Sequence, residues 1–68
     1  MGPAEYHITL SLIADTPEEL SLMTVQAQVN WGMKLAFSPF SQLRNGKFIT
    51  TFEMPYRIYA ERVANGKG

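Results

Sequence analysis

The sequence predicts a small α+β fold, a βαββ unit in which one main helix packs on a small antiparallel-rich sheet. Three observations support this prediction: strict alternation of apolar and polar residues over 6–12, a helix start signal at Thr16, and an Asn45-Gly46 dipeptide between two apolar segments. The chain of 68 residues is long enough for one core. We therefore expect a single domain over 1–68, with 1–4 and 65–68 as disordered tails.

The first element is a half-buried strand over residues 6–12. Alternate side chains of a strand point to opposite faces of the sheet. One side carries apolar residues and the other carries polar ones: Tyr6, Ile8, Leu10 and Leu12 against His7, Thr9 and Ser11. We expect the apolar side to face the core.

The second element is the main helix, which should begin after Thr16 and run to about Met33. Thr16 suits the N-cap and Pro17 the first helical position. Glu19 completes a capping box if its carboxylate accepts from the Thr16 amide. Gly32 and the later Pro39 disfavour continuation of the helix.

This helix carries two apolar stripes on different sides of its cylinder. The first stripe is Leu20, Met23, Ala27 and Trp31, and the second is Leu22, Val25, Val29 and Met33. A three-stranded sheet covers only one stripe. We expect the bulkier first stripe to pack on the sheet and the flatter second stripe to face a second chain.

The third element is a hairpin. Residues 34–38 and 40–43 read as a strand that Pro39 interrupts, which favours an edge position or a bulge. Asn45-Gly46 is typical of a two-residue type I′ turn with positive φ at both residues. A second strand over 48–54 follows, with Phe48, Thr50, Phe52 and Met54 on one face.

The last segment, 55–63, opens with Pro55 and is followed by Asn65-Gly66. Its apolar residues fall at helical spacing: Tyr56, Tyr59, Ala60 and Val63. This pattern favours a short C-terminal helix, with an extension of the preceding strand as the alternative.

The composition favours association. A domain of this size buries only about 60% of the surface of its unfolded chain. Without cysteine, neither a disulfide nor a thiolate zinc site can stabilise it. Because 46% of the residues are nevertheless hydrophobic, we expect the chain to fold, most simply as a homodimer.

The sequence shows no catalytic, metal or cofactor motif. The single His7 has no evident orienting acid, and no serine lies in a nucleophile-elbow pattern. The acids Asp15, Glu18 and Glu19 complement the helix dipole at its positive end and need no metal ion. We therefore expect no enzyme activity and no cofactor.

The charge distribution leaves a second function open. Residues 1–33 hold four acidic and no basic side chains, a charge of −4, whereas residues 34–68 hold six basic and two acidic ones, a charge of +4. A basic, aromatic hairpin could bind single-stranded nucleic acid through Lys34, Arg44, Lys47, Phe48, Phe52 and Arg57.

The leading expectation is a non-enzymatic interaction module, a small accessory or regulatory protein that docks on and modulates another protein. Its size and compactness also suggest a phage-type protein. The candidate interface is Leu22, Val25, Val29, Met33 and Trp31, because Trp and Met are enriched in interface cores. The alternative is that Trp31, Met23 and Met33 are buried beneath the C-terminal helix. A structural subunit of a larger assembly is the third possibility. No apolar segment is long enough to cross a membrane, and no secretory signal is visible, so we expect a cytoplasmic protein.

Overall fold

The computed structural model describes residues 5–66 and shows a small α+β fold with a three-stranded antiparallel sheet and two helices. The elements are β1 (His7–Ala14), α1 (Pro17–Trp31), β2 (Ser41–Gln42), β3 (Phe48–Pro55) and α2 (Tyr56–Gly66). Of the expected tails, 1–4, 67 and 68 lie outside the described residues. Asn65 and Gly66, which we expected in a tail, belong to the last turn of α2.

The sheet has the strand order β1-β3-β2, so the long β3 is central. β1 and β3 pair along their full lengths, from His7 opposite Pro55 to Ala14 opposite Phe48. The alternation predicted for the first strand is confirmed: Ile8, Leu10 and Leu12 pack against the core, whereas the polar side chains of β1 are exposed. Tyr6 precedes β1 and is 76% exposed, so it does not join the apolar side.

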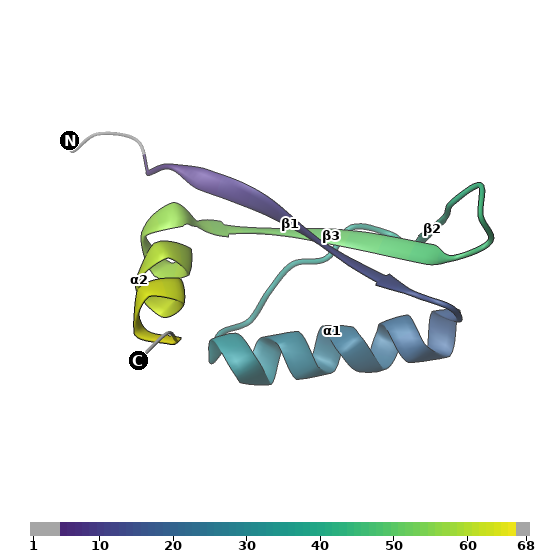
Figure 1. The fold of residues 1–68 in the computed structure, drawn as a ribbon, viewed down its shortest axis with the longest axis horizontal. Helices are drawn as coiled ribbons and strands as arrows, with labels where there is room; N and C mark the ends of the chain where they lie inside the picture. Colours follow the sequence, from purple (N-terminus) through teal and green to yellow (C-terminus); the bar gives the residue numbers. More distant parts are fainter. Residues whose placement is uncertain (1–4, 67–68) are drawn as a thin grey trace.

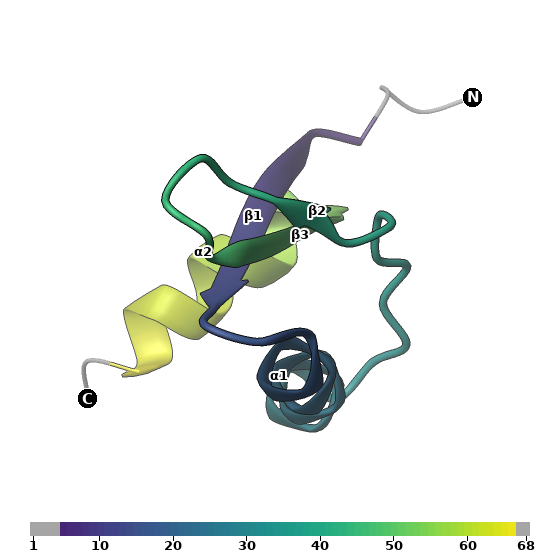
Figure 2. The same ribbon diagram turned by 90° about the vertical axis from the view of Figure 1, so that its right-hand side faces the viewer.

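Both helices lie on the same side of the sheet (Figures 1 and 2). α1 runs beneath the length of the strands, and α2 lies at the end where β3 terminates (Figure 1). The core forms between α1 and the sheet. Its buried apolar residues are Ala14, Leu20, Ala27, Leu35, Phe52 and Met54.

The start of α1 follows the predicted signals with one difference. The Glu19 amide donates to the Thr16 hydroxyl at 3.1 Å, and Pro17 occupies the first turn, as expected. The Glu19 carboxylate, however, accepts from the Asp15 amide at 3.1 Å and not from that of Thr16. It therefore satisfies a donor of the β1–α1 connection, one residue before the N-cap.

α1 ends at Trp31, because Gly32 adopts the left-handed conformation (φ 66°). The Gly32 amide donates to the Val29 carbonyl at 3.2 Å, and the Met33 amide donates to the Gln28 carbonyl at 3.2 Å. This pattern is a Schellman motif, and it turns the chain back toward the sheet.

The strand expected over 34–43 is largely irregular. It keeps an isolated bridge between Phe37 and Phe52 and the two-residue β2, whose Ser41 lies opposite Ile49. Three residues separate these contacts on the β2 side and two on β3, which is a bulge around Pro39. The prediction that Pro39 marks an edge or a bulge is confirmed.

The hairpin lies where Asn45-Gly46 predicted it, but the prediction of a type I′ turn is wrong. The Leu43 amide donates to the Lys47 carbonyl at 2.7 Å, so the loop has three residues, 44–46. Gly46 has a φ of 89°, whereas Asn45 does not have a positive φ. A three-residue loop needs a left-handed residue only at its last position.

The last segment is a helix, which settles the alternative left open for 55–63. α2 begins directly after Pro55, the last residue of β3. None of its residues is fully buried, although Tyr59 stacks on Trp31 of α1 and Arg62 donates to the Asn30 carbonyl.

Candidate protein-interaction surface

The side of α1 that points away from the sheet carries an exposed apolar surface, here called the outer stripe: Leu22, Val25 and Val29. With 3.6 residues per turn, these residues lie on the opposite side of the helix from Leu20 and Ala27. Leu20 is fully buried and Ala27 is 7% exposed, whereas Leu22, Val25 and Val29 are 58%, 54% and 75% exposed. The first stripe thus packs on the sheet, as expected.

The side chains of α1 beside the outer stripe are polar and uncharged, and Arg62 of α2 lies near its C-terminal end, where it donates to the Asn30 carbonyl. Ser21, Gln26 and Asn30 are exposed beside it, and no residue of α1 is basic. Glu18 lies four residues before Leu22 and continues the line of the stripe toward the start of the helix. Lys34 is exposed just beyond the other end. The stripe therefore has an acidic end at Glu18, and the loop that follows its other end carries a basic side chain, Lys34.

Two other residues of the candidate interface lie elsewhere. Met33 is partly buried against the chain's own core, because the left-handed Gly32 directs the chain away from the helix axis. Trp31 is also partly buried, and its ring stacks on Tyr59 with centroids 6.1 Å apart. The Arg62 guanidinium lies 4.9 Å from the Trp31 ring centroid, and Arg62 also donates to the Asn30 carbonyl. The structure therefore reduces the exposed candidate surface to the outer stripe.

The residues considered for nucleic-acid binding do not come together. Phe52 is 3% exposed and Phe48 is partly buried on the same side of β3, so neither presents an open ring for base stacking. Arg57 pairs with Glu5 at one end of β3, with Nη2 and Oε2 3.2 Å apart, and Lys47 pairs with Asp15 at the other. Arg44 and Lys34 remain exposed on separate loops.

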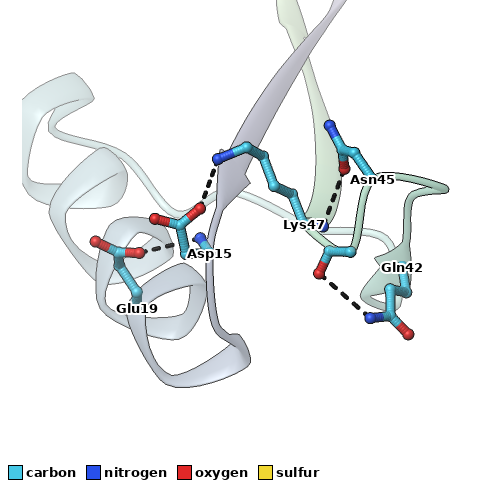
Figure 3. A network of polar contacts seen from close by, with 6 residues as sticks. Asp15, Glu19, Gln42, Asn45 and Lys47 are labelled. Atoms are coloured by element: carbon cyan, nitrogen blue, oxygen red, sulfur yellow. Dashed lines mark hydrogen bonds and ion pairs between the residues drawn. The ribbon is translucent and has the colours of Figure 1, made fainter.

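A polar network joins the hairpin to the β1–α1 connection (Figure 3). The Lys47 ammonium donates to the Asp15 carboxylate at 2.5 Å, while the Asp15 amide donates to Glu19. The Lys47 amide donates to the Asn45 side chain at 3.0 Å, and the Gln42 side chain donates to the Gly46 carbonyl at 3.2 Å. The hydrogen bond to Asp15, with its charge and that of Glu19, raises the pKa of Lys47 above its usual 10.5.

A shallow hollow of about 360 Å³ lies beside the bulge, lined by Ala36, Phe37, Ser38, Thr51, Phe52 and Glu53. The Ser38 hydroxyl accepts from the Thr51 amide at 3.0 Å and lies 3.3 Å from the buried Thr50 hydroxyl. These bonds replace ladder hydrogen bonds that the bulge interrupts, so the hydroxyl cluster has a structural role.

The described residues contain no group of three or more His, Asp or Glu side chains that could hold a metal ion. His7 lies on the uncovered face of the sheet, where its Nδ1 donates to the Glu5 carbonyl at 3.0 Å. This arrangement gives His7 a local backbone partner and no carboxylate.

The chain matches no protein-family model, no curated protein sequence and no solved structure. Between residues 5 and 66, neither helix has the length and apolar character needed to cross a membrane.

Proposed function

We propose that this protein is a non-enzymatic interaction module that self-associates through the outer stripe of α1. The observation that supports this proposal is the exposure of three large aliphatic side chains in one line, directly opposite the buried side of the same helix. Contiguous exposed apolar surface of this kind is typical of interaction sites. The partner that binds the outer stripe is another copy of the same chain.

Charge and helix orientation favour that occupant. If two α1 helices pack antiparallel, Glu18 of each copy lies toward Lys34 of the other. The positive end of each helix dipole then lies beside the negative end of the other, which is favourable. Within residues 5–66, neither Glu18 nor Lys34 takes part in an ion pair. The β-branched Val25 and Val29 form a flat contact surface at the centre of such a pair.

Substitution of Val25 by Glu tests the proposal. In Val25→Glu, a carboxylate in the apolar contact costs several kcal/mol unless it is protonated, so the mass measured by light scattering should fall while circular dichroism stays unchanged. Gln26→Glu is the matched control, because it adds the same charge at an exposed polar position of α1. Ala27→Glu should unfold the chain, since Ala27 is in the core.

The opposite results would contradict the proposal. A Val25→Glu protein with the wild-type mass would show that the outer stripe takes no part in self-association. A Val25→Glu protein that unfolds, beside a folded Ala27→Glu protein, would show that the two sides of α1 are reversed.

A further inference from the structure

We propose that the free edge of β1 is a second self-association surface, on which β1 of another copy adds in antiparallel orientation. This inference goes beyond the outer stripe, with which it shares no residue. It would make one continuous sheet across two copies. The structure supports it through the hydrogen-bonding direction of β1, its composition and the symmetry of its sequence.

The hydrogen-bonding direction of β1 follows from its pairing with β3. The Tyr56 amide donates to the Tyr6 carbonyl at 2.7 Å, so Tyr6 and Tyr56 form a hydrogen-bonded pair. Such pairs alternate along an antiparallel ladder, and the even-numbered residues of β1 therefore bond to β3. His7 lies opposite Pro55, which has no amide proton, in agreement with this parity.

The odd-numbered residues of β1 consequently direct their backbone amides and carbonyls away from β3. These residues are His7, Thr9, Ser11 and Ile13. β1 is an edge strand, and within residues 5–66 no other strand pairs with this side of it. All four residues are exposed. An edge of this kind is a template for another strand.

The two edges of the sheet differ in their protection. The β2 edge has only two strand residues, with Pro39 and a bulge beside them, and both features discourage pairing with another chain. β1 is eight residues long and contains no proline and no Lys, Arg, Asp or Glu. Its edge therefore carries neither the proline nor the charged side chains that commonly prevent strand addition.

β1 is complementary to itself in one antiparallel register, with the two-fold axis at Leu10. In this register, His7 lies opposite Ile13 of the second copy, and Thr9 lies opposite Ser11 of the second copy. All four outward-directed residues then form hydrogen-bonded pairs. On the face that α1 covers, Ile8 lies opposite Leu12 of the second copy, so the apolar core continues across the junction.

The charged side chains at the two ends of this register do not prevent the pairing. Glu5 lies opposite Asp15 of the second copy, but each acid already has a cation in its own chain. Arg57 contacts Glu5, and Lys47 contacts Asp15. These ion pairs reduce the repulsion between the two carboxylates. Between these two positions, the paired segments contain no Lys, Arg, Asp or Glu.

Proline at position 11 tests the proposal. Ser11→Pro removes an outward amide that β3 does not use, so the fold should persist by circular dichroism while light scattering shows a loss of mass. Ser11→Ala retains the amide and should behave as the wild type. The double variant Ser11→Pro/Val25→Glu should be a monomer, whereas each single variant should retain association through the other surface.

Amide hydrogen exchange in the wild type gives an independent test. The outward amides at 7, 9, 11 and 13 should exchange at least about tenfold more slowly at high protein concentration than at high dilution, whereas the even-numbered amides should be protected at both. Unprotected odd-numbered amides in the associated protein would overturn the β1 proposal even if Ser11→Pro fails to fold.

The two proposals fail separately. If the Ser11→Pro protein has the wild-type mass while the Val25→Glu protein has a lower mass, the β1 proposal is wrong and the outer-stripe proposal stands. If only Ser11→Pro lowers the mass, the outer stripe fails and the β1 edge stands. A wild type that is monomeric at every concentration would overturn both.

Discussion

At the scale of single residues, Gly46 and Asn45 show why the turn type could not be predicted from the dipeptide alone. Asn-Gly suits a type I′ turn when the strands pair directly beside it. Here Leu43 pairs with Lys47, which leaves three residues in the loop and requires a positive φ only at Gly46. The position of the turn was encoded locally, whereas its type depended on the register of β2 against β3.

Substitutions in this loop test the observed turn. Gly46→Ala should destabilise the protein by about 1–2 kcal/mol, because an L-residue is strained at positive φ. No heavy atom lies within 4 Å of the position of the added Cβ, so steric contact adds nothing. Asn45→Ala should cost less, about 0.5–1 kcal/mol, since it loses only the hydrogen bond from the Lys47 amide. If urea denaturation showed that both substitutions lower the free energy of unfolding equally, Asn45 would instead also be strained.

Lys47 should make a small, pH-dependent contribution to stability. Its pKa is higher in the folded than in the unfolded protein, so the contribution is fully present below the ordinary value of 10.5 and is lost as the pH rises through the raised pKa. Lys47→Met should therefore melt slightly below the wild type at neutral pH, and the two proteins should converge at strongly alkaline pH. Because the pair is exposed, high salt should also reduce the difference. A difference that persists in both conditions would contradict this explanation.

At the scale of the elements, the sequence predicted the strands and the main helix where the pattern is local. Thr16, Pro17 and the alternation over 7–12 act within a few residues, and the structure confirms each of them, whereas Tyr6 stays outside the strand. The free edge of β1 was missed, although the lack of charge and proline in 6–12 was a signal for it. Recognising that edge requires the strand order, which depends on contacts between distant residues. The same holds for α2, whose position against Trp31 no local pattern indicates.

The contact between α1 and α2 depends on Tyr59. Tyr59→Ala removes the ring that stacks on Trp31 and should destabilise the protein by roughly 1–3 kcal/mol. Trp31 is the only tryptophan, so its fluorescence should also shift to longer wavelength as it becomes more exposed. Val63→Ala, at a residue that is 46% exposed, is the control and should change neither quantity appreciably. An unchanged spectrum in Tyr59→Ala would show that α2 does not cover Trp31.

At the scale of the whole molecule, the fold is elongated for its length. Its radius of gyration is 13.7 Å, compared with about 11 Å for a compact domain of 68 residues. Only six apolar residues are buried in the described part of the chain, and α2 buries none of its own. Three aliphatic side chains on α1 and the edge of β1 remain open on different sides of this small core. These features are the reason to expect stability to depend on association.

The melting temperature of the wild type should therefore rise with protein concentration. If unfolding is coupled to dissociation of a dimer, a tenfold increase in concentration should raise Tm by about 3–6 °C, given the unfolding enthalpy typical of a chain of this length. The Ser11→Pro/Val25→Glu protein should melt at a lower temperature that does not change with concentration, because both proposed contacts are absent. The single variants should remain concentration-dependent, but with lower Tm than the wild type at equal concentration. A wild-type Tm that is constant over a hundredfold range, with a monomeric mass throughout, would mean that the small core is stable alone and that neither exposed surface binds a second copy.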